Sequence, residues 1–308
     1  MNVVITGATG FIGSALVEAL RDHAVTALVR DVESARERLG PQAGAVKLVR
    51  ADLETQGPWC DTLDGADAIL HLAGEPVAAR RWNARVKQLI RDSRVESTRT
   101  IVEVIAKSTS RPAVLVTASG VDYYPFADDN DFDDDEVTES DPAAETTFLG
   151  RVCRDWEHEA LAAEAHRVRV VCMRTGMVLG RGGALAKLRT PFSLFAGGPI
   201  GGGRQWVSWI HRDDAVAAYA AALTDSRYRG PINLVTDSIR NADFARALGK
   251  ALHRPSWLPV PAFAIKAAVG EFAESIVHGR RVVPAKLRTL GFQWRYPSLA
   301  EALAASIA

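Results

Sequence analysis

The sequence predicts an α/β fold built on a doubly wound parallel sheet, with a smaller, mostly helical lobe towards the C-terminus. Short apolar, β-branched segments alternate with amphipathic helical patterns from Val3 as far as Val235. This alternation is typical of a parallel sheet with helices on both faces. The first apolar segment, Val3–Ile5, leads directly into a glycine turn, and a helical pattern follows at once. A strand, a glycine turn and a helix in this order open the Rossmann fold, which binds dinucleotides.

The glycine turn has the spacing G-x-x-G-x-x-G. We expect Gly7 to allow the sharp turn, Gly10 to let the backbone approach a pyrophosphate, and Gly13 to let the helix pack against the strand. The N-terminus of that helix would offer free N–H groups to the phosphates. An ordinary tight turn between a strand and a helix is the alternative. The residues of this turn that we predict to bind a cofactor are Gly7, Thr9, Gly10, Phe11, Ile12 and Gly13.

The alternation continues along the chain with right-handed crossovers expected between the strands. The predicted strands are Val3–Thr6, Val25–Val29, Val46–Arg50, Ala68–Leu72, Val114–Thr117, Val168–Arg174 and Ile232–Val235. The clearest helical patterns are Gly13–Leu20, Arg85–Lys107 and Phe148–Ala165.

The pattern changes after residue 175. Segment 176–204 is rich in glycine and predicts long loops around one helix, and segment 240–308 is mostly helical with prolines between its parts. Segment 209–223 returns to a strand followed by a helix, for which Asp213 is a natural N-cap. We therefore expect a Rossmann domain of residues 1–175 plus about 206–236. The rest, 176–205 plus 237–308, would form a substrate lobe over the carboxyl ends of the strands, where open α/β sheets bind ligands.

The composition argues against several classes of protein. The chain has 308 residues, 47% of them hydrophobic and 24% charged, and its net charge is zero, so nothing steers it towards nucleic acid or an anionic membrane. No apolar stretch approaches the length of a membrane span. A strand predicted from near residue 2 leaves no room for a signal peptide, and three scattered cysteines fit a reducing compartment, so we expect a cytoplasmic protein. The acidic stretch Asp128–Glu136 lacks the central glycine of a calcium loop, so we expect a solvated surface loop and no metal site.

The end of the second strand predicts which nucleotide is bound. An acidic residue there would bind the ribose of NAD, whereas a basic residue would pair with the 2′-phosphate of NADP. If the strand ends at Val29, Arg30 takes this position, and its guanidinium can hold a phosphate with two hydrogen bonds. Asp31 follows directly and keeps NAD open as the alternative. We predict NADP, with Arg30 as the selecting residue.

Two further strand ends fit a nucleotide site. Asp52 and Leu53 follow the third strand, where a carboxylate can face the adenine amino group. Small residues follow the fourth strand in Leu72, Ala73 and Gly74 and would let the backbone pass along the cofactor. An aspartate at a strand end is often only a helix cap, so their order along the chain is what supports the prediction.

These motifs, together with longer ones downstream, carry a resemblance to a known family. Thr6–Gly13, His71–Gly74 and Thr117–Ser119 are in register with the short-chain dehydrogenase/reductase superfamily, in its extended and atypical branches. The segments Gln205–Asp214 and Arg254–Pro261 resemble one subgroup, sugar-nucleotide epimerases with a C-terminal domain of unknown function, often labelled cell-division-inhibitor-like. The resemblance spans nearly the whole chain. It implies a Rossmann core, bound NADP(H), a small-molecule substrate and, in many members, a homodimer.

The catalytic pair of this superfamily is missing. Its tyrosine and lysine stand four residues apart on one helix face, and the lysine charge lowers the pKa of the phenol that transfers a proton. The corresponding positions here are Leu149 and Cys153, and Y-x-x-x-K occurs nowhere in the sequence. Ser119 matches the superfamily's serine and could hold a substrate oxygen. Tyr124 could donate a proton, although the sequence places no cation next to it, and packing under the substrate loop is its alternative role.

Three polar side chains complete the candidate site. His211 ends a block of tryptophans suited to a pocket and could titrate near neutral pH, or could be fixed by a hydrogen bond as a structural residue. Arg174 and Lys187 are expected near the nicotinamide end, where they could bind the cofactor or an anionic substrate, or form ion pairs. Our catalytic candidates are Ser119, Tyr124 and His211, and Arg174 joins the cofactor residues.

Two functions are compatible with this sequence. The first is an NADP-dependent oxidoreductase or epimerase-like enzyme that acts on a hydroxyl or carbonyl group of a small molecule, such as a nucleotide sugar. The second is a non-catalytic NADP(H)-binding redox sensor or partner-binding protein, because the Tyr/Lys pair is absent and a fold alone does not fix a function.

Overall fold

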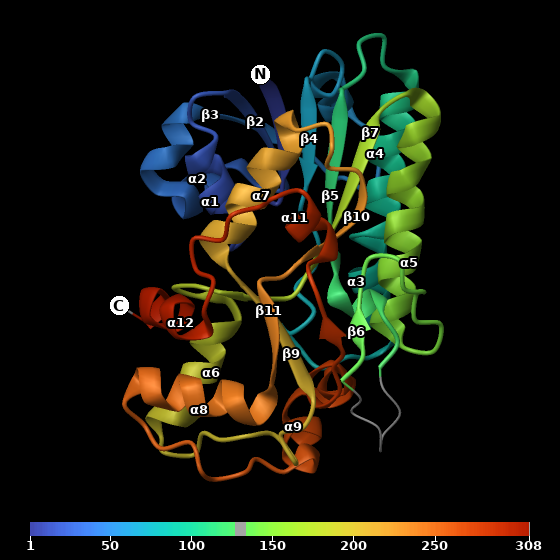
Figure 1. Ribbon diagram of the computed structural model, residues 1–308. Coiled ribbons are helices and arrows are strands. Elements are labelled where there is room, and N and C mark those ends of the chain that lie inside the picture. The colour runs from blue at the N-terminus through green and yellow to red at the C-terminus, as the bar shows by residue number, and fades with distance from the viewer. Residues whose placement is uncertain (127–133, 308) are drawn as a thin grey trace.

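Seven parallel strands form the main sheet of the computed structural model, which describes residues 1–126 and 134–307. The strand order is β10-β7-β5-β4-β1-β2-β3 (Figure 1). The strands are β1 (Asn2–Thr6), β2 (Ala24–Val29), β3 (Val46–Arg50), β4 (Ala68–His71), β5 (Val114–Gly120), β7 (Arg169–Thr175) and β10 (Gly230–Leu234). All seven predicted strands are present within three residues of their expected ends. The predicted α/β doubly wound sheet is confirmed.

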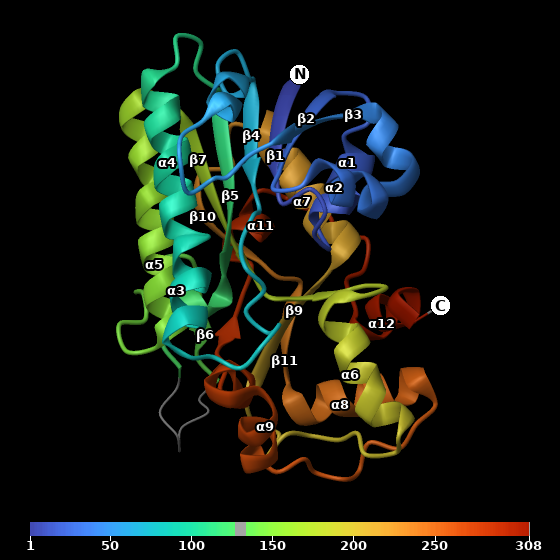
Figure 2. The same cartoon turned by 180° about the vertical axis from the view of Figure 1, so that it is seen from behind.

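Helices cover both faces of this sheet, as the two opposite views show (Figures 1 and 2). On one face lie α1 (Gly13–Ala19), α2 (Val32–Leu39) and α7 (Arg212–Thr224), whose Leu16 and Tyr219 are buried against Ile5. On the other face lie α4 (Val95–Lys107) and α5 (Phe148–Leu161), with Ile101, Ile105 and Ala160 buried against Leu115. The apolar periodicity of each helix therefore faces the sheet, as the alternation of segments predicts.

The chain reverses direction across the sheet between β1 and β4. From β1 it steps outward to β2 and β3, and it then returns to place β4 on the other edge of β1. Residue Thr6 at the end of β1 is paired with Leu28 on β2 and with His71 on β4. The loops that leave β1 and β4 thus diverge from a common edge, which is where doubly wound folds bind dinucleotides.

A second lobe lies below the carboxyl ends of the main strands in Figure 1. Its three-stranded sheet has the order β11-β9-β8, and its buried core includes Leu185, Trp209, Phe244 and Leu303. The elements of this lobe are β8 (Met177–Leu179), α6 (Gly183–Ser193), β9 (Trp206–His211), β11 (Asp237–Arg240), α8 (Asn241–Leu252), α9 (Ala262–Val269), α10 (Glu274–Val277) and α12 (Leu299–Ile307). We expected segment 206–236 to belong entirely to the Rossmann domain, but the structure places β9 in the second sheet and only α7 and β10 with the first.

Shorter elements complete the fold. The strands β6 (Glu136–Val137) and β12 (Arg281–Val282) pair in parallel. The remaining helices are α3 (Ala84–Asp92), α11 (Ala285–Thr289) and the single turns η1 (Gly40–Ala45), η2 (Pro58–Thr62), η3 (Val121–Tyr123), η4 (Ala162–His166) and η5 (Gly270–Ala273). Most of the predicted acidic loop, residues 128–133, lies outside the described residues.

Two local expectations were wrong. The helix predicted over 85–107 is divided at Ser93 and Arg94 into α3 and α4. The Ser93 hydroxyl accepts a hydrogen bond from the Glu75 N–H, and Arg94 donates to the Ile90 and Glu75 carbonyls, so these side chains replace helical hydrogen bonds at the break. The N-cap of α7 is His211 and not Asp213, because the Asp213 N–H donates to the imidazole Nδ1 over 3.2 Å.

Neither a membrane span nor a metal site is found in the described part of the chain. No helix within residues 1–126 and 134–307 is both long and apolar enough to cross a bilayer. The same residues contain no group of three histidine, cysteine or acidic side chains that could hold a metal ion.

Candidate functional site

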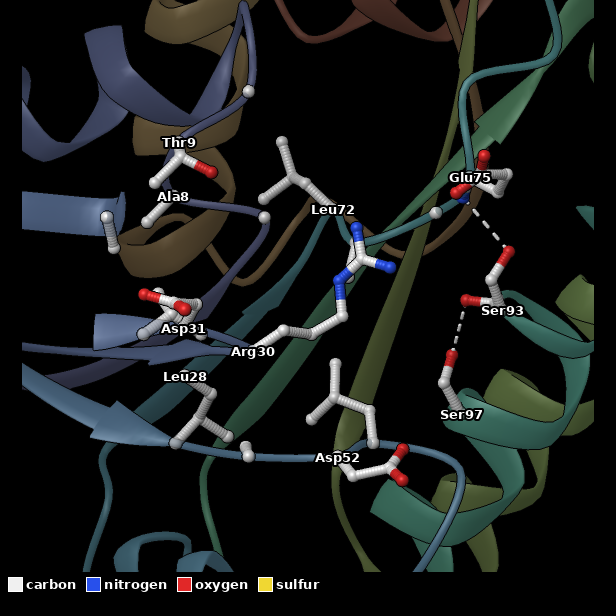
Figure 3. A pocket seen from close by; sticks show the side chains of 18 of the residues that line it. Ala8, Thr9, Leu28, Arg30, Asp31, Asp52, Leu72, Glu75, Ser93 and Ser97 are labelled. Atoms are coloured by element: carbon white, nitrogen blue, oxygen red, sulfur yellow. Dashed lines mark hydrogen bonds between the residues drawn. The ribbon is translucent and has the colours of Figure 1, made fainter. Parts of the chain in front are cut away.

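A cavity of about 370 Å³ opens at the carboxyl ends of β1, β2, β3 and β4. It extends along the turns after these strands and along the first turns of α2 (Figure 3). The predicted cofactor residues that line it are Gly7, Thr9, Gly10, Arg30, Asp52, Leu53, Leu72, Ala73 and Gly74. Four strand ends that are far apart in the sequence are thus brought together in the predicted order.

The glycine turn after β1 has room for a ligand only because its glycines lack side chains. Gly7 has a φ of +72°, and a Cβ there would lie 2.7 Å from the carbonyl carbon of Leu72. A Cβ on Gly13 would lie 2.1 Å from the Gly7 carbonyl oxygen. Around Gly10 the Gly7 oxygen, at 3.1 Å, is the one atom within 4 Å of such a Cβ, so this glycine presents bare backbone to open space. The turn fits the close approach that a pyrophosphate requires.

The end of β2 supplies positive charge to the cavity. The Arg30 side chain is exposed and extends into the cavity between Thr9 on one side and Glu75 on the other (Figure 3). The neighbouring Asp31 carboxylate accepts a hydrogen bond of 2.8 Å from the Ser34 N–H and caps α2. Asp31 also lines the cavity, but one of its carboxylate oxygens is engaged by the helix, whereas no hydrogen bond within the described residues engages Arg30.

Sequence reasoning missed two more residues of this region. Ser34 and Arg38 on α2 also line the cavity. Ser34 and Arg38 are four residues apart on α2, which is the spacing that puts helical side chains on one face, and Arg30 stands four residues before Ser34, just after β2. This interval was present in the sequence and could have indicated a hydroxyl and a second guanidinium beside the first.

A buried histidine fixes the edge between β1 and β4. The Thr6 hydroxyl lies 2.7 Å from His71 Nδ1 and accepts a hydrogen bond of 3.1 Å from the Ala73 N–H in the cavity wall. Ser97 lies 3.3 Å from His71 Nε2 on the other side of the ring. Burial, assisted by the charge of Arg94, lowers the pKa of His71 to about 3. His71 is therefore a neutral positioning residue, and its role could not be derived from the sequence motif alone.

Three residues of the predicted turn lie outside the cavity lining. Ile12 packs against the core of the sheet, and Gly13 lies beneath Gly7. The Phe11 ring is turned towards the second lobe, where a Cβ on Gly180 would lie 2.9 Å from the ring and one on Gly183 equally close. The glycines that precede α6 therefore make room for Phe11.

The catalytic candidates Ser119 and Tyr124 belong to a buried network around Arg174. Arg174 forms a two-pronged ion pair with Glu157, with Nη2 2.8 Å and Nε 2.9 Å from the two carboxylate oxygens, and both side chains are at most 5% exposed. The Ser119 hydroxyl donates to the same carboxylate over 2.7 Å. The Tyr124 hydroxyl accepts from Arg174 over 2.8 Å and donates to Asn233 Oδ1 over 2.6 Å. None of these five residues lines the cavity.

The network corrects the expectation that Tyr124 has no cation beside it. Arg174, 50 residues away in the sequence, bonds to its hydroxyl. Burial nevertheless raises the pKa of Tyr124 above its ordinary value, against the lowering effect of Arg174. Burial would lower the pKa of Arg174, but its hydrogen bonds to Glu157 outweigh this and raise it. A charged arginine and a neutral phenol are therefore hydrogen-bonded to each other in the interior.

His211 has a structural environment as well. Its Nδ1 accepts the Asp213 N–H at the start of α7, and its ring packs on Tyr296 with 4.0 Å between centroids. Burial lowers the pKa of His211, against the raising effect of the Asp213 and Asp214 charges. The predicted charge Lys187 donates to the Ala78 carbonyl over 2.9 Å on the exposed surface.

The positions that correspond to the superfamily's Tyr/Lys pair are apolar and buried. Leu149 is 6% exposed and packs with Val86 and Ile90 of α3. Cys153 is also 6% exposed, and burial raises the pKa of its thiol to about 12. Neither side chain can transfer a proton near neutral pH.

A doubly wound parallel sheet, a glycine turn and a cavity across the strand-order reversal define a dinucleotide-binding α/β protein. Comparison with known proteins specifies the family. Residues 3–234 match the NAD dependent epimerase/dehydratase family, and residues 260–306 match a domain of unknown function, DUF1731. The chain belongs to this epimerase/dehydratase family, within the extended short-chain dehydrogenase/reductase superfamily that the motifs indicated.

Relatives align along almost the whole chain. The chloroplastic homologue of epimerase family protein SDR39U1 from Arabidopsis thaliana is 41% identical, over 99% of this chain and 86% of its own length. Epimerase family protein ML0860 from Mycobacterium leprae is 37% identical, over 98% of this chain and 94% of the relative. Among solved structures, human SDR39U1 (isoform 2), crystallised with NADPH, superimposes with a TM-score of 0.86 at 33% identity and covers 99% of both chains.

Proposed function

We propose that this protein binds NADP(H) in the cavity at the ends of β1 to β4. The observation that carries the proposal is the glycine turn, in which a Cβ at Gly7 or Gly13 would collide with backbone while Gly10 faces open space. Gly7, Thr9 and Gly10 would hold the pyrophosphate, and Leu72, Ala73 and Gly74 would lie along the rest of the dinucleotide. The NADPH in the human relative agrees with this assignment.

The charges around β2 favour NADP(H) over NAD(H). Arg30 and Arg38 line the cavity together with Ser34, and Asp31, which also lines it, has one carboxylate oxygen engaged in capping α2. Two guanidinium groups and a hydroxyl match a 2′-phosphate in charge and in hydrogen bonding. Asp52 is left to face the adenine, as its position at the end of β3 suggests.

We further propose that the protein is an oxidoreductase or epimerase-like enzyme that acts on a hydroxyl or carbonyl carbon of a small molecule. The bound nicotinamide would supply hydride chemistry, and the second lobe over the strand ends would enclose the substrate. A nucleotide sugar is a candidate substrate because the family includes epimerases and dehydratases. A cytoplasmic location and a homodimer remain predictions.

Isothermal titration calorimetry with NADPH and NADH tests the cofactor assignment. The wild type should bind NADPH more tightly, and Arg30→Asp should weaken NADPH by about tenfold or more while it changes NADH little. Arg36→Asp is the matched control, because Arg36 is exposed on α2, the helix that follows Arg30, but does not line the cavity. Equal affinity of the wild type for the two nucleotides would remove the arginines from the argument, and no binding of either would end the proposal.

A non-catalytic NADP(H) sensor is the second candidate. It is favoured by Leu149 and Cys153, which are buried and cannot replace the Tyr/Lys pair. A sensor would gain or lose a protein partner with cofactor oxidation state. Pull-downs in NADP⁺ and in NADPH that recover the same partners would count against it.

A further inference from the structure

A carboxylate and a thiol both lie close to Gly120 at the carboxyl end of β5, beyond the buried network. A Cβ built on Gly120 would lie 3.6 Å from Asp122 Oδ2 and 3.6 Å from Cys153 Sγ. Asp122 belongs to η3, directly after the strand, and its carboxylate turns back towards the strand end. Cys153 occupies the position of the superfamily lysine, so Asp122 stands beside the place where the missing pair would act.

Arg94 connects this point to the cavity. A Cβ on Gly74, a cavity-lining residue, would lie 2.9 Å from Arg94 Cζ. The guanidinium donates to the Glu75 carbonyl over 3.0 Å and lies 5.4 Å from the Trp156 ring, on the same helix as Cys153. The cation is therefore placed between the cavity wall at β4 and helix α5.

The dinucleotide should reach this point. The β1 to β3 side of the strand-order reversal holds the adenosine half in doubly wound folds, and the nicotinamide half crosses to the other side. On that side the strands next to β1 are β4 and β5, whose ends carry Gly74 and Asp122. The cavity extends past Gly74 to Pro76 and Ser93, and Asp122 itself lies beyond this lining.

The environment makes Asp122 the titratable group at this point. Burial raises its pKa, and a hydrogen bond from Ser275 of α10 and the charge of Arg94 oppose the rise. Cys153 also acts on it, and burial raises the pKa of this thiol to about 12, which keeps it neutral. A carboxyl group whose pKa is raised towards neutrality is suited to general acid–base work.

We propose that Asp122 is the proton-transfer residue of this protein and that Arg94 is the residue that positions and tunes it, in place of the Tyr/Lys pair. The proposal deepens the proposed function and rests on it. In the oxidation of an alcohol, the hydroxyl proton passes to Asp122 Oδ2 while the carbon loses hydride, with its electron pair, to the oxidised nicotinamide. The carbonyl, the reduced cofactor and a protonated carboxyl result, and the reverse step returns the proton.

The first test needs no substrate, because the oxidised nicotinamide ring carries a positive charge and the reduced ring does not. An ionised Asp122 beside the ring should favour NADP⁺, so the affinity for NADP⁺ relative to NADPH should rise with pH as Asp122 ionises. The 2′-phosphate is common to both nucleotides, so its ionisation cancels from this ratio. Asp122→Asn should lower the NADP⁺ affinity by about tenfold, leave NADPH nearly unchanged and remove the pH dependence of the ratio.

Asp155→Asn is the matched control, since Asp155 lies on α5 two residues from Cys153 but pairs with Arg154 at the exposed surface. It should leave both affinities unchanged. A ratio that stays independent of pH in the wild type, or that Asp122→Asn leaves unaltered, would overturn the proposal about Asp122. If neither nucleotide binds the wild type, the proposed function itself fails, so the two failures can be told apart.

The second test addresses Arg94. Arg94→Gln removes the positive charge, so the pKa of Asp122 should rise and the pH at which the affinity ratio changes should move upward. Arg94→Lys retains the charge and should restore the wild-type profile in large part. An unmoved profile in a folded Arg94→Gln protein would show that Arg94 has only a structural role.

Discussion

The two halves of the sheet, β1 to β4 and β5, β7 and β10, differ in the surroundings of their polar side chains. At the ends of β1 to β4, backbone is bare and Arg30 extends into an open cavity. Around β5, β7 and β10, Ser119, Tyr124 and Arg174 are buried and hydrogen-bonded to one another or to Glu157 and Asn233. The first half therefore offers side chains to an open cavity, whereas these polar residues of the second half bond to one another in the interior.

The largest expected effect comes from removing the buried ion pair of Arg174 with Glu157. Arg174→Ala leaves the Glu157 carboxylate unpaired in the interior, which should cost about 3–5 kcal/mol in free energy of unfolding. Urea unfolding followed by circular dichroism measures it. Arg154→Ala, which removes an exposed pair with Asp155, is the control and should change the stability little. Equal effects of the two substitutions would mean that the buried pair contributes no more than a surface pair.

The next largest effect is a loss of NADPH affinity when the glycine turn is filled, with the protein still folded. Gly10→Val places a branched side chain where the pyrophosphate would lie, so the NADPH affinity should fall by about 100-fold or more. Gly44→Val is the control, because the described residues, apart from the chain neighbours of Gly44, place no atom within 4 Å of a Cβ there. Calorimetry and thermal unfolding should be measured together. A Gly10→Val protein that binds NADPH normally would show that the turn does not hold the cofactor.

The next prediction concerns His71, at the end of β4 where the two halves of the sheet meet. Its contribution to stability can be measured by unfolding the protein at different pH values. The folded pKa of His71, about 3, is below its unfolded value, so between the two the unfolded chain binds the proton and the native protein does not. Stability from this residue is complete above about pH 6.5 and falls as the pH is lowered, by up to about 1.4 kcal/mol per pH unit. His71→Gln should flatten this slope in urea unfolding, whereas His158→Gln, at an exposed position on α5, should leave it as in the wild type.

The smallest effect concerns Tyr124. Tyr124→Phe leaves an Arg174 N–H and the Asn233 Oδ1 without their partner, which should cost about 1–2 kcal/mol in stability. NADPH affinity should not change, because the phenol does not line the cavity. A stable Tyr124→Phe protein with strongly reduced turnover of any carbonyl substrate would instead return Tyr124 to the reaction.

The cofactor half could be predicted from the sequence because its requirements are local. The glycine spacing, the β-branched segments and the residue after each strand all lie within a few positions of one another, and strand ends meet at one edge of a parallel sheet. The hydrogen bond of Tyr124 with Arg174 and the charge interaction of Asp122 with Arg94 join segments that are tens of residues apart. No periodicity in the sequence reports such pairings, so Ser119 was assigned from its match to the superfamily's serine and Tyr124 from its place just downstream.

The place of Phe11 links these halves in a further way. Its ring points away from the phosphate-binding turn and fills the space beside Gly180, Gly182 and Gly183, at the start of α6. The sequence of one short turn is therefore constrained from two sides, by the nucleotide site and by packing against the second lobe. A graft of a foreign lobe onto this core would need a matching recess for that ring, however well the rest of the junction was designed.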